Sequence, residues 1–245
     1  MRICGEYTCT GCGACIYVCK RQCIDFKKNS YGEIYAEVDK DNCINCQRCI
    51  NICPQNQKVK GKYPIKAYAA WSKLRQIRNY AASGGIATEI YTKAIKNGDY
   101  IIGAKFNDDC SVALKMTNNI SDIEEFKNSK YVFSNTENIY IEIEKCLKVG
   151  KKIVAIGLPC QIAAIKKLFS ENDDLLLIDL VCHGTTPFND LKEHIKKLEE
   201  TKKQKINKIS FRAPEFGTEN FVFAAYNNFI IKNLDKKFCF IFSKS

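Results

Sequence analysis

The chain has 245 residues, of which 15 are cysteine, and its Lys and Arg residues outnumber Asp and Glu by 11. An apolar fraction of 46% with 13 Gly and 5 Pro is typical of a globular protein and excludes a collagen-like or disordered chain. The longest apolar run, Leu175 to Cys182, contains Asp179 and is too short to span a membrane. Because the N-terminus lacks the apolar stretch of an export signal, we expect a cytoplasmic protein, in which clustered cysteines favour metal over disulfides.

Ten of the 15 cysteines lie in the first 53 residues, which predicts a small module over residues 1–62 that ends in the polar linker 55–64. The spacing C-x2-C-x2-C-x3-C occurs twice, 34 residues apart, at Cys9, Cys12, Cys15 and Cys19, and at Cys43, Cys46, Cys49 and Cys53. Three thiolates on one tight loop can hold one cubane, while a fourth thiolate reaches the other. This chemistry favours two 4Fe-4S clusters over zinc or a disulfide knot. The repeat resembles that of two-cluster ferredoxins, which implies an α+β, ferredoxin-like dicluster module.

The remainder, residues 63–245, alternates apolar strands with amphipathic helices, which predicts an α/β domain with a mixed, mostly parallel sheet. Its first helix is expected to start after Ser83-Gly84-Gly85 and to end at Gly98. Apolar strands over residues 100–106 and 111–116 follow, and the short turn between them predicts a hairpin.

Further elements are expected in the same alternation. Ser121 and Glu124 form the pattern of a capping box at the start of a short helix. The helices and strands expected after it are helix 136–149, buried strand 152–156, a helix through Phe169, buried strand 175–181, helix 188–202, and late strands over residues 206–212, 221–226 and 229–232.

Two loops directly follow the buried strands and open helices. They contain Gly157-Leu158-Pro159-Cys160-Gln161 and Cys182-His183-Gly184-Thr185-Thr186-Pro187. Ligands of such sheets bind beyond the carboxyl ends of the strands, and the free N–H groups of a helix start suit phosphate. With Ser83-Gly84-Gly85, three glycine-bearing helix starts predict a nucleotide-like cofactor.

The motifs SGGIAT, GAKF, SKYVFS, GLPCQIAAIKK, DLVCHG and ISFR occur in this order. Together they resemble the coenzyme F-420 hydrogenase/dehydrogenase beta-subunit family, while residues 1–60 resemble bacterial two-cluster ferredoxins. The ferredoxin resemblance implies one cluster on Cys9, Cys12, Cys15 and Cys53, and the other on Cys43, Cys46, Cys49 and Cys19. Because Lys20 rather than Pro follows Cys19, Cys23 is an alternative ligand; Cys4 is expected to be a free thiol.

The family resemblance implies an iron–sulfur flavoprotein oxidoreductase, usually with FAD, whose cofactor carries the redox chemistry. It implies flavin contacts for Ser83, Gly84, Gly85, Gly157, Leu158, Pro159, Cys160, Gln161 and Gly184, with Cys160, Cys182 and His183 at the same site as candidate catalytic residues. Structural roles for these three remain alternatives, as does a third cluster that adds Cys239. The family's members extend further, so the chain looks shortened at its C-terminus, and an electron-relay subunit without flavin is the alternative function.

The excess of Lys and Arg over Asp and Glu does not indicate a nucleic-acid partner. Lys and Arg are dispersed along the chain, and each oxidised cluster with four thiolates adds a charge of about −2. We therefore expect a redox partner protein or a soluble electron carrier, no nucleic acid, and a small-molecule substrate that the sequence does not identify.

Overall fold

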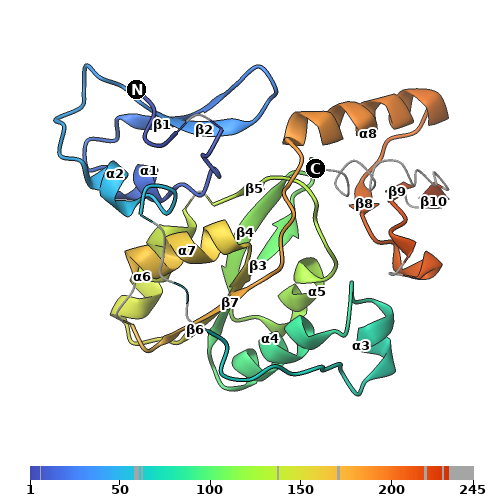
Figure 1. The fold of residues 1–245 in the computed structure, drawn as a ribbon. Helices are drawn as coiled ribbons and strands as arrows, with labels where there is room; N and C mark the ends of the chain where they lie inside the picture. The colour runs from blue at the N-terminus through green and yellow to red at the C-terminus, as the bar shows by residue number, and fades with distance from the viewer. Residues whose placement is uncertain are drawn as a thin grey trace.

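The structure is a computed structural model that describes residues 1–5, 7–57, 61, 63–136, 138–169, 172–217, 220–227 and 229–231, the last of these by backbone alone. Figure 1 shows an N-terminal module, a central sheet with its helices, and a C-terminal unit built on one long helix. Cys239 and the end of the last expected strand lie outside the described residues.

The N-terminal module consists of two short helices and a hairpin: α1 (Ala14–Val18), β1 (Ile24–Lys28), β2 (Ile34–Val38) and α2 (Arg48–Ile52). The strands are antiparallel, with Ile24 opposite Val38. The sequence repeat is also a repeat of backbone conformation, because α1 and α2 both begin after a left-handed residue. That residue is Gly13 (φ 75°) in the first half and Gln47 (φ 59°) in the second.

The central sheet has five strands in the order β5-β4-β3-β6-β7. Only the β3–β4 pair is antiparallel, and the other three pairs are parallel. This confirms the mixed, mostly parallel sheet and the expected hairpin. The strands are β3 (Tyr100–Phe106), β4 (Val112–Thr117), β5 (Ser134–Asn135), β6 (Ile153–Gly157) and β7 (Leu175–Asp179).

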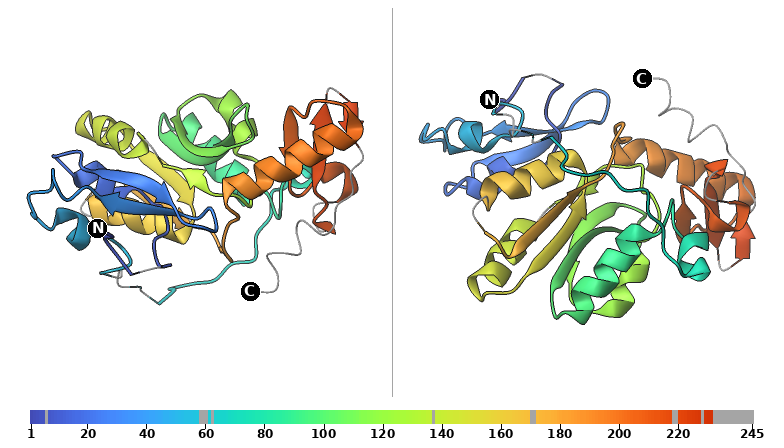
Figure 2. Two further views of the ribbon diagram at one scale, coloured as in Figure 1. Left: turned by 90° about the horizontal axis from the view of Figure 1, so that it is seen from above. Right: turned by 60° about the horizontal axis from the view of Figure 1, so that its bottom comes forward.

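Helices cover both faces of this sheet, as Figure 2 shows. On one face α4 (Ile86–Lys96) and α5 (Ile123–Phe126) bury Tyr91 and Ile123. On the other face α6 (Ile139–Lys148) and α7 (Pro159–Leu168) bury Ile143 and Ile165. The short α3 (Arg75–Asn79) precedes α4. Alternate side chains of β6 enter the two cores, which explains its uninterrupted apolar sequence.

From the sequence, residues 175–181 are expected to form a buried strand. The strand is present as β7, but the prediction that it is buried is wrong. In β7 Leu176 is 55% exposed, and Leu180 and Val181 just beyond it are also exposed. The physical reason is that β7 pairs only with β6 in the described sheet, so its outer edge has no neighbour. An apolar run therefore marks an edge strand here.

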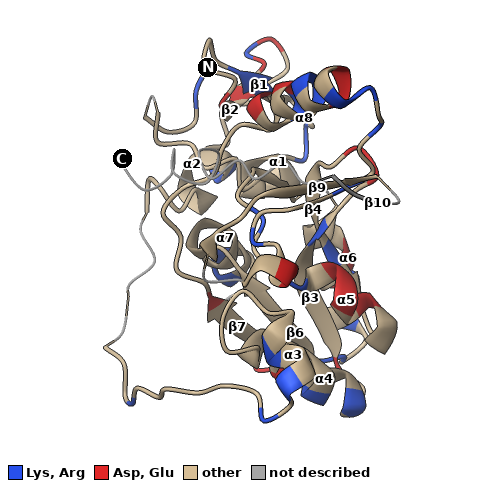
Figure 3. Cartoon of the chain, turned by 90° about the vertical axis from the view of Figure 1, so that its right-hand side faces the viewer, with Lys and Arg blue, Asp and Glu red and all other residues tan. Residues whose placement is uncertain are grey.

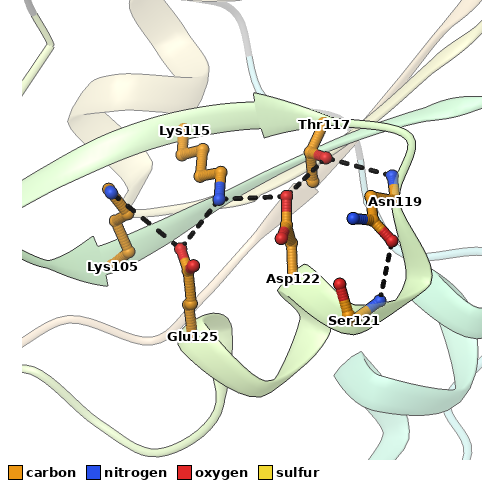
Figure 4. Close-up of polar contacts among 7 residues, drawn as sticks. All are labelled: Lys105, Lys115, Thr117, Asn119, Ser121, Asp122 and Glu125. Carbon is orange, nitrogen blue, oxygen red and sulfur yellow. Dashed lines mark hydrogen bonds and ion pairs between the residues drawn. The ribbon is translucent and has the colours of Figure 1, made fainter.

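The capping box expected at Ser121 is also absent. Asn119 caps the turn instead, with its side chain accepting a hydrogen bond from the Ser121 amide (3.2 Å) at the start of η1 (Ile120–Asp122). Figure 4 shows how α5 is then fixed to the hairpin, because Lys115 pairs with Asp122 (2.9 Å) and Glu125 (3.0 Å).

The C-terminal unit is formed by α8 (Phe188–Lys202) and a second, antiparallel sheet of strand order β10-β9-β8. Two of these strands, β8 (Lys208–Ser210) and β9 (Ala224–Asn227), are shorter than the sequence predicts, and η2 (Pro214–Phe216) lies between them. The third strand is β10 (Phe229–Ile231). Leu191, Phe211 and Phe223 form the centre of its core. Lys and Arg alternate with Asp and Glu along α8 (Figure 3). Within the described residues, no helix combines the length and apolar character needed to cross a bilayer.

Candidate functional site

Four of the expected cluster ligands surround one small pocket in the N-terminal module. Its lining includes Cys9, Cys12 and Cys15 from the first repeat and Cys53 from the second, which is the set that the ferredoxin resemblance assigns to one cubane. Burial raises the pKa of the Cys12 thiol to about 11, and it raises the pKa of Cys15 as well. Metal binding replaces the protons of such thiols, so the donor set and its enclosure fit an iron–sulfur cluster.

The second set of cysteines lies at the outer end of the module. Cys19, Cys43 and Cys49 pack against one hydrophobic cluster with the buried Cys23, while Cys46 is exposed. The sulfur of Cys23 lies 3.6 Å from that of Cys19. Proximity therefore leaves both Cys19 and Cys23 available as the fourth ligand.

Two single substitutions separate these ligands. Because the ferredoxin spacing assigns the fourth position to Cys19, Cys23→Ala is expected to retain about eight irons per chain. Cys19→Ala keeps that content only if Cys23 takes its place, and the double variant is expected to fall to about four. Iron and sulfide analysis of anaerobically prepared protein measures this. A Cys23→Ala protein with half the iron would make Cys23 the native ligand.

The loop that carries the first cluster ligands is packed against the α/β domain. The Cys12 carbonyl accepts hydrogen bonds from Thr136 Oγ1 (2.9 Å) and from the Tyr140 hydroxyl. A Cβ atom on Gly13 would lie 2.8 Å from Thr136 Oγ1, and Gly13 also has φ +75°. Glycine is therefore required here for both close approach and backbone conformation.

Lys167 joins the module to α7. Its ammonium group donates hydrogen bonds to the carbonyl oxygens of Asn51 (2.9 Å), Gln57 (3.1 Å) and Cys53 (3.4 Å). The last carbonyls of a helix have no partner within it, so this lysine satisfies the end of α2 and holds the Cys53 backbone against the α/β domain.

A cleft of about 650 Å³ lies where the two domains meet. Ligand sites in proteins commonly have this size. Its lining comes from the first cluster loop and the β1–β2 hairpin of the module, and from the loops after β6 and β7 of the α/β domain. The lining contains Cys9, Thr10 and Cys12 from the module, and Leu158, Pro159, Cys160, Gln161, Cys182, Gly184, Thr185, Thr186 and Pro187 from the α/β domain.

Two threonines in this cleft have surroundings that the sequence did not indicate, although Thr10 lies in the first cysteine repeat and Thr186 in the loop after β7. The Thr10 hydroxyl lies close enough to the thiols of Cys12 and Cys160 to favour their thiolate forms, although burial still raises the pKa of both. Thr186 Oγ1 is buried without a hydrogen-bond partner in the described part of the chain. An unpaired buried hydroxyl costs stability, and at this position a bound polar group can satisfy it.

Other predicted site residues lie outside the cleft lining. The exposed His183 is one of them, and Ser83, Gly84 and Gly85 precede α4 on the opposite face of the sheet from α7. The Gly84 carbonyl accepts a hydrogen bond from the Ser72 amide (2.7 Å), and a Cβ on Gly84 would lie 2.7 Å from the Ala70 carbonyl oxygen. Close chain packing thus explains Gly84, and a flavin contact at residues 83–85 stays a prediction.

Contacts within the loop after β6 explain why it contains Gly157 and Gln161. Gln161 is buried, and its Oε1 accepts a hydrogen bond from the Leu158 amide (2.9 Å) at the start of α7. A Cβ on Gly157 would lie only 3.1 Å from that oxygen. Gly157 and Gln161 therefore shape the loop, while Leu158, Pro159 and Cys160 are presented to the cleft.

Three family models match consecutive parts of the chain. They are the 4Fe-4S dicluster domain (residues 8–57), the coenzyme F-420 hydrogenase/dehydrogenase beta subunit N-term (67–139), and the C terminus of the same beta subunit (150–240). The two beta-subunit models together cover about two thirds of the chain.

Individual relatives agree with these models. An uncharacterized protein of Methanocaldococcus jannaschii is 27% identical over 78% of this chain and 63% of its own length. The coenzyme F-420-dependent sulfite reductase of that organism is 24% identical over 65% of this chain and 25% of its own. Ferredoxin-3 of Nostoc sp. is 39% identical over 20% of this chain and 64% of its own. The chain thus spans less than two thirds of each relative.

Among solved structures, a chain of the F-420-reducing [NiFe] hydrogenase complex from Methanosarcina barkeri matches with a TM-score of 0.46 and 21% identity, over 64% of this chain and 55% of that one. The chain is an electron-transfer protein of the oxidoreductase type that holds 4Fe-4S clusters. Three findings support this: the cysteine repeat, the match to the dicluster domain and the ferredoxin relative. The chain belongs to the coenzyme F-420 hydrogenase/dehydrogenase beta-subunit family, with a dicluster ferredoxin domain at its N-terminal side.

Proposed function

We propose that this protein is an iron–sulfur flavoprotein oxidoreductase that binds FAD in the cleft between its two domains. The observation that carries the proposal is the position of the cleft. Its walls combine the first cluster loop, through Cys9 and Cys12, with two glycine-bearing loops beyond the carboxyl ends of β6 and β7. Cofactors of α/β sheets bind at this edge.

The residues of the cleft then have distinct tasks. Cys9 and Cys12 bring the first cluster to the wall of the cleft, so that electrons have a short path between cluster and cofactor. Residues 158–160 and Gly184 form the facing wall, and Thr186 Oγ1 offers a hydrogen bond to a polar group. When bound, a flavin supplies the exchange between single electrons and electron pairs.

Cys160 and Cys182 are proposed to lie beside the bound cofactor. Both line the cleft, and burial together with the nearby Cys182 raises the pKa of the Cys160 thiol. Cys160 also lies close to Cys12. His183 is proposed to act from the same loop. The second substrate is proposed to be a soluble electron carrier or a small molecule, and the names of the relatives suggest coenzyme F-420 as the first carrier to test.

An electron-relay subunit without flavin is the second candidate. It requires only clusters held against the α/β domain, and the contacts of Cys12, Gly13 and Lys167 supply that packing. The two candidates differ in one measurable quantity, the flavin content.

The test is anaerobic purification followed by incubation with FAD and gel filtration. Iron and sulfide are expected near eight per chain, and denaturation is expected to release about one flavin per chain if the cleft holds a single cofactor. Full iron content with no flavin after this treatment would contradict the flavoprotein and support the relay.

A pair of variants locates the flavin. Loss of one hydrogen bond costs about 1 kcal/mol, so Thr186→Val is expected to weaken FAD binding by about fivefold. Ser83→Ala, outside the cleft, is expected to leave binding unchanged. The opposite result would place the flavin at the start of α4.

A further inference from the structure

The two cluster loops differ in their surroundings. The first is packed against α6 and the loop before it, as the contacts of Cys12 and Gly13 show. The second faces solvent, with Cys46 exposed and Ile44 65% exposed. Its left-handed positions carry Asn45 and Gln47, where the first loop has glycines. One cluster is therefore directed inward to the cleft and the other outward.

Positive side chains border the outward loop. We define the distal face as Ile44, Cys46 and four exposed cations: Lys20, Arg21, Lys40 and Arg48. Lys20 and Arg21 directly follow Cys19. The Lys40 carbonyl accepts a hydrogen bond from the Cys43 amide (3.4 Å), and Arg48 is the first residue of α2. The four cations thus come from both halves of the module, and each lies within three residues of an expected ligand of the second cluster.

The carboxylates Asp39 and Asp41 flank Lys40, so the four cations of the distal face outnumber the acidic residues next to them in the chain. In the described part of the chain none of the four forms an ion pair with a carboxylate. Asp39 accepts hydrogen bonds from the Asp41 amide (3.0 Å) and Asn42 Nδ2 (2.7 Å), which fix its carboxylate within the turn without removing its charge. The surface therefore combines an apolar centre at Ile44 with a basic border.

We propose that the distal face is the docking surface for an acidic electron-carrier protein, which exchanges electrons with the second cluster. An apolar centre with a charged rim is the usual anatomy of a protein interface, and complementary charge accelerates encounter and fixes orientation. The proposal rests on the electron-transfer role and names the partner's chemistry and side of entry. It applies equally to the flavoprotein and the relay.

The test compares two double charge reversals in the cluster-loaded protein. Arg21→Glu/Arg48→Glu alters the distal face, and Lys192→Glu/Lys197→Glu makes the same change of net charge on α8, which extends away from the N-terminal module (Figure 2). The probe is an oxidised acidic two-cluster ferredoxin, whose binding is measured by calorimetry at low and high salt. The rate at which the reduced ferredoxin reduces the protein is a second measurement.

The distal variant is expected to bind at least about tenfold more weakly at low salt, with a proportionate loss in association rate. High salt is expected to remove most of this difference, because exposed charges are then screened. The α8 variant is expected to match the wild type within about twofold. Equal weakening of both variants, or no weakening of the distal one, overturns the proposal. Flavin content does not enter either measurement, so this result is independent of the FAD test.

Discussion

Cys46→Ala is expected to remove the outward cluster and leave the inward one, which lowers the iron content from about eight to about four per chain. Cys46 is an expected ligand of that cluster and lies on its exposed loop. A cubane cannot be held firmly by the remaining three thiolates, and metal binding contributes much of the folding energy of such small modules. Iron and sulfide analysis, together with the visible absorption of the clusters, measures the loss.

The matched control for this prediction is Cys146→Ala. Cys146 is only 6% exposed, and it packs in the core of α6 with Ile143 and Ile153. Its removal leaves a small cavity and is expected to destabilise the protein by about 1 kcal/mol without any loss of iron. Equal iron loss in both variants would show that the cysteines have been divided wrongly between cluster ligands and core residues.

Gly13→Ala is expected to separate the first cluster loop from the α/β domain. The added Cβ would lie 2.8 Å from Thr136 Oγ1, which holds the Cys12 carbonyl, and the residue has φ +75°. A left-handed non-glycine residue costs about 1–2 kcal/mol, and overpacking adds about 1–3 kcal/mol. Anaerobic thermal unfolding followed through the cluster absorbance is expected to show a loss of about 2–5 kcal/mol for the two effects together.

Gln47→Ala tests the same position of the second repeat. Gln47 already has φ 59° and is exposed, so the change adds neither a left-handed side chain nor a steric contact. A surface substitution of this kind is expected to alter stability by no more than about 0.5 kcal/mol. If Gly13→Ala is equally neutral, packing against Thr136 does not hold the first loop in place.

Local patterns predicted most of the elements that position the site. The cysteine spacing indicated the module, and the periodicity of the apolar residues indicated α4, α6, α7 and α8 together with the strands β3, β4 and β6. These features follow from contacts close in sequence. The edge position of β7 could not be predicted, because burial depends on which strand lies beside it and not on the apolar character of Leu175 to Val181.

The cleft required information that a single sequence does not contain. Thr10, Thr186 and Lys167 lie within motifs that the sequence shows, but nothing in those motifs indicates what their side chains contact. Lys167, for example, binds the Asn51 carbonyl across 116 positions. The one local signal was the pair of glycines in the first cluster loop, Gly11 and Gly13. These glycines are consistent with close packing of the first loop against another part of the protein, because the second loop has Asn45 and Gln47 at the matching positions.

The sharing of one core by both domains links iron supply to maturation of the whole chain. Ala14 is fully buried among residues of α6 and α7, and Tyr17 donates a hydrogen bond to Glu144 (2.9 Å). We expect protein made without iron to lack a folded module, because metal binding contributes much of the folding energy of such modules, and part of the α/β core is then uncovered. The iron-free chain is therefore expected to be sensitive to proteases, so that quality control removes the species that cannot carry electrons.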